Sequence, residues 1–207
     1  MKLPFSKLML ALLVIPPATL SADEQEDGAV RLVKELGGGV DRDEQARHRP
    51  VIVVYLAYTN VTPTDLKRLA NELARVKTLR RLDLSNTGNT GTTDAGLKEI
   101  SVLKQLHWLD LSGTRVTDAG LKHLAGLSEL RELELEDTVV TDVGLKELAT
   151  LRKLEHLNLC FTKVTDKGLG HLAMLKELRS LRLRETQVSE AGINELRKAL
   201  PKCRIVR

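Results

Sequence analysis

The sequence contains few aromatic residues and only two cysteines. Phe, Trp and Tyr make up 2% of the 207 residues, whereas 42% of the chain is hydrophobic, so the core must consist of aliphatic side chains. We expect two strand spacings, roughly 9.6 Å, between Cys160 and Cys203 in the repeating fold described below. That separation exceeds the reach of a disulfide, so the fold must hold without one.

The chain also lacks the short motifs of common active sites. It contains no G-x-S-x-G, H-E-x-x-H or C-x-x-C sequence. His107, His156 and Cys160 fall on one predicted sheet face, but they have neither the spacing nor the carboxylate support of a metal site. We therefore expect no enzyme activity, no cofactor and no bound metal.

The net charge of the chain is too small to favour nucleic-acid binding. The formal net charge is +4, and Lys2 and Lys7 lie in a segment that we expect to be removed, which leaves about +2 on the mature chain. Neither a basic run nor an array of aromatic residues accompanies this charge. We therefore expect a protein partner, without nucleic-acid binding.

Residues 1–22 have the composition of a secretory signal. Lys2 and Lys7 precede an apolar run from Leu8 to Ile15, which is far shorter than the roughly 20 residues of a membrane-spanning helix. Two prolines end the run, and small residues before position 23 suit cleavage. We predict export to the periplasm, the cell surface or the medium, with no stable membrane insertion after signal cleavage.

Residues 23–49 are predicted to form a polar leader and an N-terminal helical cap. The acidic stretch 23–27 is expected to be mobile. Ala29, Val33 and Leu36 then recur at helical spacing, and the glycines that begin at Gly37 end the helix. This cap would cover the open apolar end of the domain that follows, residues 50–207.

Leucine at a fixed period is the most abundant signal in the sequence. Segments that start at Leu106, Leu130, Leu154 and Leu178 follow one another every 24 residues and share the pattern L-x-x-L-x-L-x-x-T-x-V-T-D-x-G-L-x-x-L-x-x-L with few departures. A constant period in this range is typical of a solenoid. The alternating leucines predict a short strand with one buried face, and the later leucines predict a short helix.

The polar positions of the pattern have predicted structural roles. The first threonine of each unit should bond to loop backbone where the chain leaves the strand, as at Thr138. The second threonine should cap the helix, and the aspartate after it suits the helix dipole, as at Thr141 and Asp142. No single unit can bury its leucines, so the units must stack.

Three stretches depart from the regular pattern. The first unit, from Val51, is degenerate, and the second, from Leu79, carries three extra residues in a glycine-rich stretch within 88–92. We interpret it as a loop on one rim, because it lacks the lysine of a phosphate-binding loop. Leu200, Cys203 and Ile205 are predicted to be the inward residues of a truncated seventh strand.

The pattern resembles the leucine-rich repeat, with Thr where many members have Asn or Cys. The T-D-x-G-L-x-x-L continuation resembles exported bacterial members and is similar to the ribonuclease-inhibitor-like repeats of eukaryotic F-box adaptors. The resemblance covers roughly residues 50–207. It implies an α/β fold, a right-handed solenoid with a curved parallel sheet on the concave face and short helices on the convex face.

The outward positions of the strands form the candidate binding surface. The third, fifth and seventh positions of each unit should point out of the concave sheet. They are acidic in the first strands and basic in the last, and the aromatic residues beyond the leader also lie in or just after strands. The candidate partner-binding residues are Tyr55, Asp83, Trp108, Asp110, Glu132, Glu134, Glu136, His156, Asn158, Arg182, Arg184 and Arg204.

These features favour a monomeric, non-enzymatic protein–protein interaction module that binds its partner on the concave face outside the cytoplasm. One alternative is an adaptor or substrate-recognition subunit that resembles F-box-associated repeats, which requires a cytosolic location. A second alternative is an enzyme with a dispersed site on the same face. A scaffold without a specific partner is a further possibility, because these repeats present surfaces of many kinds.

Overall fold

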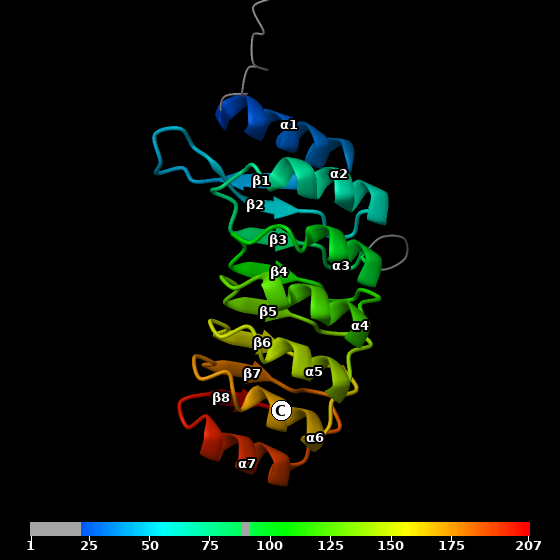
Figure 1. Ribbon diagram of the computed structural model, residues 1–207, viewed down its shortest axis with the longest axis vertical. Helices are drawn as coiled ribbons and strands as arrows, with labels where there is room; N and C mark the ends of the chain where they lie inside the picture. Colours follow the sequence, from blue (N-terminus) through cyan, green and yellow to red (C-terminus); the bar gives the residue numbers. More distant parts are fainter. Residues whose placement is uncertain (1–21, 88–91) are drawn as a thin grey trace, which may run out of the picture.

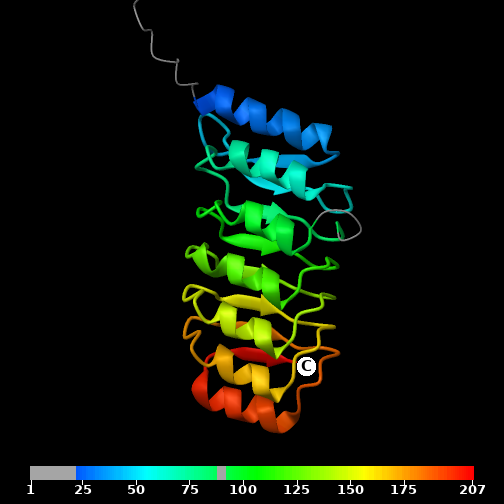
Figure 2. The same cartoon turned by 45° about the vertical axis from the view of Figure 1, so that its right-hand side comes forward.

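The computed structural model describes residues 22–87 and 92–207, so the predicted signal and part of the glycine-rich insertion lie outside the described residues. The described part of the chain contains no helix long and apolar enough to cross a membrane. Figures 1 and 2 show an elongated stack of strand–helix units, with the helices along one side of a single sheet.

The sheet has eight strands in sequence order. The first two strands pair antiparallel, and every later pair is parallel. The strands are β1 Gly39–Arg42, β2 Val51–Tyr55, β3 Arg81–Asp83, β4 Trp108–Asp110, β5 Glu132–Glu134, β6 His156–Asn158, β7 Ser180–Arg182 and β8 Arg204–Val206. The helices are α1 Ala22–Glu35, α2 Pro63–Leu73, α3 Asp94–Ile100, α4 Asp118–Leu121 with the 3-10 turn η1 Lys122–Gly126, α5 Asp142–Leu148, α6 Asp166–Leu172 and α7 Glu190–Ala199.

The sheet register confirms the 24-residue period. Leu109 pairs with Leu133, Leu133 with Leu157, and Leu157 with Leu181. Each of these leucines is at most 2% exposed, and the leucines of the helices are buried between sheet and helix layer in the same way. The α/β solenoid is therefore as the sequence predicted, with an aliphatic core that runs the length of the stack.

The N-terminal end of the stack is covered by α1 and β1. Ala29, Leu32 and Val33 of α1 are buried, and the helix gives way to a turn at Gly37, which has a φ of 81°. Glu26 accepts a hydrogen bond from the Val51 backbone at 2.7 Å. The backbone of the acidic stretch 23–27 lies inside this helix, where the sequence predicted a mobile leader.

The first threonine of each unit bonds as predicted. Thr138 donates its hydroxyl to the Leu135 carbonyl at 2.7 Å, and the equivalent threonines make the same bond three residues back. The residue before each threonine has a left-handed backbone, for example Asp137 with a φ of 52° and Phe161 with a φ of 57°. This repeated turn directs the chain from the strand into the loop.

The T-D-x-G motif links neighbouring units, which the sequence analysis did not predict. Asp118 Oδ1 accepts from the Thr141 backbone N–H at 2.8 Å, and its Oδ2 accepts from the Thr141 hydroxyl at 2.6 Å. A Cβ on Gly144 would lie 2.5 Å from the same carboxylate, so the glycine leaves room for it. We call these links the aspartate ladder; they start from Asp94, Asp118, Asp142 and Asp166.

The register of the last strand differs from the prediction by two residues. Ile205 pairs with Leu181, whereas the sequence interpretation had placed Cys203 opposite that leucine. A slip of two residues keeps every side chain on its predicted face, because side chains alternate with a period of two. Arg204 therefore still faces outward, but it lies beside Ser180.

Candidate interaction surface

The outer face of the sheet, opposite the helices, carries the predicted residues in parallel rows. We call it the sheet face. Strand register fixes a first row of Trp108, Glu132, His156 and Arg204, and a second row of Tyr55, Asp83, Asp110, Glu134, Asn158 and Arg182. Glu136 and Arg184 follow β5 and β7 two residues after the second row.

Three carboxylates stand next to one another in the second row. Asp83, Asp110 and Glu134 occupy paired positions on β3, β4 and β5, and we call them the acid row. Burial raises the pKa of Asp110, and the neighbouring Asp83 and Glu136 add to that effect. Burial also raises the pKa of Glu134. Like charges packed this closely favour a cationic partner, because an added cation would relieve both repulsion and desolvation.

Arg182 bridges the acidic and basic parts of the sheet face. One guanidinium nitrogen lies 3.9 Å from Glu134 Oε2, and another lies 3.7 Å from Glu136 Oε2. The side chain reaches from β7 across β6, and 53% of it is exposed. These are long, solvated contacts, which contribute little energy and leave the arginine free to change partner. The predicted separation of charge along the stack is thus partly neutralised within the chain.

Asn158 lies below the surface, so it is poorly placed for the direct partner contact that the sequence analysis expected. It is 2% exposed, donates to Glu136 Oε2 at 2.8 Å and accepts from the Cys160 backbone at 3.0 Å. Its neighbour Cys160 is also buried, as a free thiol. Asn158 orients Glu136 and supports the turn after β6.

The aromatic residues of the sheet face are already in contact with polar groups. The Arg81 guanidinium lies 4.5 Å from the centre of the half-buried Trp108 ring. The Tyr55 hydroxyl donates a hydrogen bond to Asp41 of β1, which raises the pKa of Tyr55. A partner would therefore meet the tryptophan as a stacked pair with Arg81 rather than as a bare ring.

The remaining predicted residues are accessible. His156, Arg184 and Arg204 are exposed, and Glu132 is half-buried. The Arg184 guanidinium lies 5.8 Å from the centre of the exposed Phe161 ring, beside the turn that follows β6. Across residues 22–87 and 92–207, no group of three His, Cys, Asp or Glu side chains is arranged to hold a metal ion.

Comparisons with known proteins agree with this geometry. Residues 106–125, 128–149 and 150–173 match the family described as Leucine Rich repeat. The crystal structure of internalin C2 from Listeria monocytogenes aligns with a TM-score of 0.58 and 22% identity, over 87% of this chain and 82% of that chain. A leucine-rich-repeat protein of Leptospira interrogans aligns with a TM-score of 0.47 and 23% identity, over 75% of this chain and 48% of that chain. No curated protein matches the sequence.

The repeats and their stacking thus define the class of the fold: it is a leucine-rich-repeat solenoid, and three of its units match the Leucine Rich repeat family. The likeness to internalin C2 concerns the fold alone, because the two sequences share 22% of their residues. The ribonuclease-inhibitor-like type of the repeats stays a prediction.

Proposed function

We propose that the protein is a non-enzymatic module that binds a protein partner through the sheet face, outside the cytoplasm. The observation that carries this proposal is the acid row beside the stacked pair of Trp108 and Arg81. Three carboxylates on consecutive strands have no ion pair shorter than the 3.9 Å contact of Arg182 with Glu134 within the described residues. A rigid sheet presents this charge without a cost for ordering a loop.

The chemistry of the sheet face suggests the chemistry of the partner. A basic segment, rich in Lys or Arg, would complement the acid row. Its cations could replace Arg182 as the ion-pair partner of Glu134 and Glu136. Charge complementarity would accelerate association and fix orientation. The aromatic ring of Trp108, packed between Arg81 and the partner, would supply the affinity of a typical interface anchor.

The location outside the cytoplasm rests on the composition of residues 1–22. If this segment is a cleaved signal, the exported protein begins near residue 23. N-terminal sequencing of protein recovered from outside the cytoplasm tests this expectation. An intact Met1 in that fraction would contradict the cleaved signal, whereas protein found only in the cytosol would favour the adaptor.

The partner-binding face can be located by site-specific cross-linking. A photoreactive amino acid at His156 probes the sheet face, and one at His123 probes the helix side of the same domain. We expect a discrete cross-linked protein from His156 and none from His123. The opposite result would place the partner on the helices and would refute the proposed site.

Affinities of the identified partner then test the chemistry. Trp108→Ala should weaken binding by about 2 kcal/mol or more, the usual size of an aromatic anchor. Glu134→Lys should slow association, most of all at low salt. Glu147→Lys, on helix α5 of the same unit, makes the same charge change away from the sheet face and serves as the control. Equal effects of the two lysine substitutions would show that only net charge matters.

A further inference from the structure

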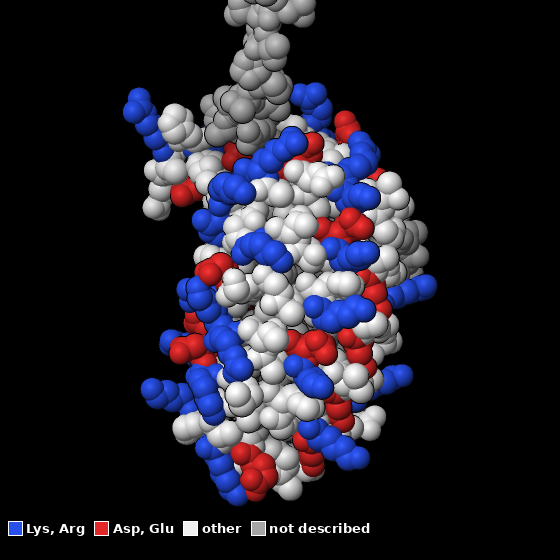
Figure 3. Space-filling view, viewed as in Figure 1, with Lys and Arg blue, Asp and Glu red and all other residues white. Residues whose placement is uncertain are grey.

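The two long edges of the solenoid differ in charge. The loops that run from helix to strand, residues 74–80, 101–107, 127–131, 149–155, 173–179 and 200–203, contain ten Lys and Arg against three Glu. The loops that run from strand to helix, 56–62, 84–93, 111–117, 135–141, 159–165 and 183–189, contain three of each sign. Figure 3 shows a file of Lys and Arg along the left-hand edge, where the first set of loops lies, whereas Lys and Arg on the right are interspersed with Asp and Glu. We call this the basic edge.

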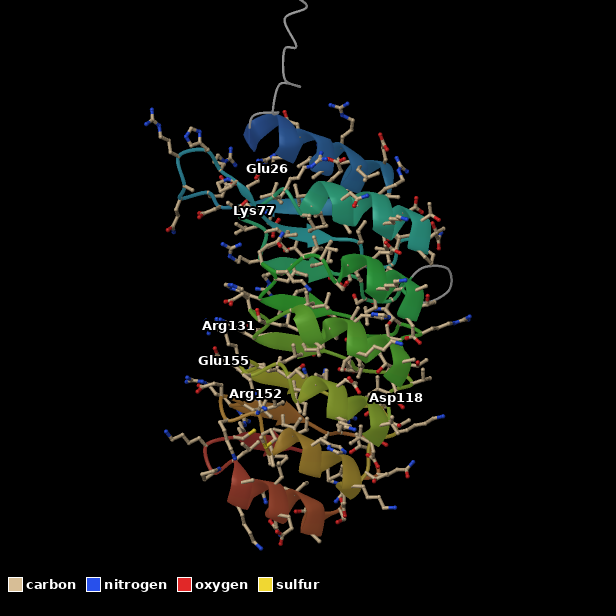
Figure 4. All side chains as sticks on the ribbon, viewed as in Figure 1. Glu26, Lys77, Asp118, Arg131, Arg152 and Glu155 are labelled. Atoms are coloured by element: carbon tan, nitrogen blue, oxygen red, sulfur yellow. The ribbon has the colours of Figure 1, made fainter. Side chains whose placement is uncertain are left out.

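Ion pairs neutralise only part of the basic edge. Lys153 contacts Glu129 at 2.7 Å, and Glu155 is shared by Arg131 at 2.5 Å and Arg179 at 3.3 Å. Figure 4 shows Arg131, Arg152 and Glu155 along the same edge, with Asp118 on the other side. Two of the three glutamates, Glu129 and Glu155, are therefore already in ion pairs, and most of the cations have no ion pair within the described residues.

Four of the cations without an ion pair stand in single file, with Ser128 at the equivalent position between Lys104 and Arg152. Lys77, Lys104, Arg152 and Lys176 occupy the same position of four units and are all exposed. Within the described residues none has a carboxylate partner. Three of them donate to carbonyl groups: Lys77 to Ala74 at 2.7 Å, Arg152 to Met174 at 2.9 Å and Lys176 to Ala199 at 3.3 Å. Neighbouring strands are about 4.8 Å apart, so the four cations span roughly 19 Å.

Capping of helix C-termini explains part of this arrangement. A cation near the last carbonyls of a helix is favourable because that end of the dipole is negative. A hydrogen bond to a carbonyl, however, does not cancel a full charge. Capping would need only one cation for each helix, and the basic edge contains more cations than helices. The opposite edge has no net charge.

We propose that the basic edge binds a linear polyanion, specifically an acidic polysaccharide, along the axis of the stack. A single file of cations fits a thread of anionic groups. A flat bilayer fits it less well, because the loop of the β1–β2 hairpin projects beyond this edge (Figure 1). Single-stranded nucleic acid is disfavoured because the helix-to-strand loops contain no Phe, Trp or Tyr on which bases could stack. The surface is separate from the sheet face, so both could be occupied together.

Heparin, a sulfated polysaccharide, is a suitable probe. The triple variant Lys104→Gln/Arg152→Gln/Lys176→Gln should bind heparin roughly 10- to 50-fold more weakly than the unchanged protein at about 0.15 M salt. The slope of the logarithm of affinity against the logarithm of salt concentration should fall in magnitude by about 0.7 for each cation removed, if heparin behaves as single-stranded nucleic acids do. Thermal melts of both proteins monitor any loss of the helix caps.

Two variants distinguish the row from general charge and from capping. Arg115→Gln/Lys163→Gln/Lys167→Gln removes the same charge from the other edge and the start of α6, and it should leave heparin affinity within about twofold. Lys104→Arg/Lys176→Arg keeps the charge and should retain binding. An equal loss in both triple variants, or a wild-type affinity that does not depend on salt, would overturn the proposal. Stronger, row-dependent binding to duplex DNA or to anionic phosphatidylserine vesicles than to heparin would replace the polysaccharide with that ligand.

Discussion

The aspartate ladder predicts that Gly120→Ala destabilises the protein although alanine is the better helix former. A Cβ at position 120 would overlap the carboxylate of Asp94, and the three nearest atoms that it would meet all belong to that residue. Asp94 accepts from the Thr117 backbone at 2.8 Å and from the Thr117 hydroxyl at 2.6 Å. The new methyl group must displace the carboxylate and break one or both of these bonds.

The magnitude follows from two opposing terms. A hydrogen bond to a charged acceptor contributes about 1.5–3 kcal/mol, whereas glycine in a helix interior costs about 1 kcal/mol relative to alanine. Gly120→Ala alone should therefore cost about 0.5–2 kcal/mol in the free energy of unfolding if one bond is lost, and about 2–5 kcal/mol if both are lost. In an Asp94→Ala background the overlap with the carboxylate is gone, and the same substitution should stabilise by about 0.5–1 kcal/mol.

Denaturant unfolding of the four proteins in this cycle measures the coupling, provided that the m-value stays constant. Distant, independent substitutions usually add within about 0.5 kcal/mol. If Gly120→Ala costs the same with Asp94 present as in the Asp94→Ala background, the glycine is not needed to make room for the Asp94 carboxylate.

Other substitutions test the core, the loops and the acid row. Leu133→Ala should cost about 2–5 kcal/mol in denaturant melts, because the side chain is fully buried; a neutral result would mean that it faces outward. Thr138→Val should cost about 1–3 kcal/mol by unpairing the Leu135 carbonyl, and Thr138→Ser, which keeps the hydroxyl, should cost less. Burial raises the pKa of Glu134, so this carboxylate binds a proton more readily in the folded protein than in the unfolded chain. The stability of the fold therefore falls as the pH rises from the unfolded pKa of Glu134 through its folded pKa. Glu134→Gln should therefore raise the melting temperature at pH 7, with a smaller gain at about pH 4; a lower melting temperature at pH 7 would contradict this. Gly170→Ala, where a Cβ would meet open space in α6, should stabilise by about 0.5–1 kcal/mol, and a loss would show an unseen constraint.

The sequence predicted the strands, the buried leucines and the roles of the first threonines because each of these depends on a local period. Alternation fixes which face of a strand is buried, and the 24-residue spacing fixes which residues become neighbours on the sheet face. The pairing of Trp108 with Glu132 follows directly from that spacing. The same logic could not detect the shifted register of β8, because alternation is unchanged by a slip of two residues.

The aspartate ladder was missed although its signal was visible. We had assigned the aspartate of T-D-x-G to the dipole of its own helix, but its hydrogen-bond partner is 23 residues further on. A local interpretation cannot find such a partner. The glycine two residues after the aspartate offered the clue, since glycine costs stability in a helix unless something else needs the space.

Burial of Asn158 was missed for a similar reason. Its position in the strand predicts an outward side chain, and the direction is correct. The side chain is nevertheless 2% exposed, because it is hydrogen-bonded among its neighbours on the sheet face. Alternation predicts the direction of a side chain but not what covers it. Expectations for a surface therefore need the lengths and charges of the neighbouring side chains as well.

The aspartate ladder also bears on how the molecule responds to force. Each carboxylate reaches into the following unit, from Asp94 onward to Ser189. Asp65, in the first unit, instead closes a capping box with Thr62 of its own helix. The contacts between neighbouring units therefore differ in their resistance to a force applied at the two ends of the chain. Among the described residues, the contact between α2 and α3 has no aspartate link, so it should separate before the contacts that have one. The N-terminal cap and the first unit would then detach together, while the five later units remain packed against one another.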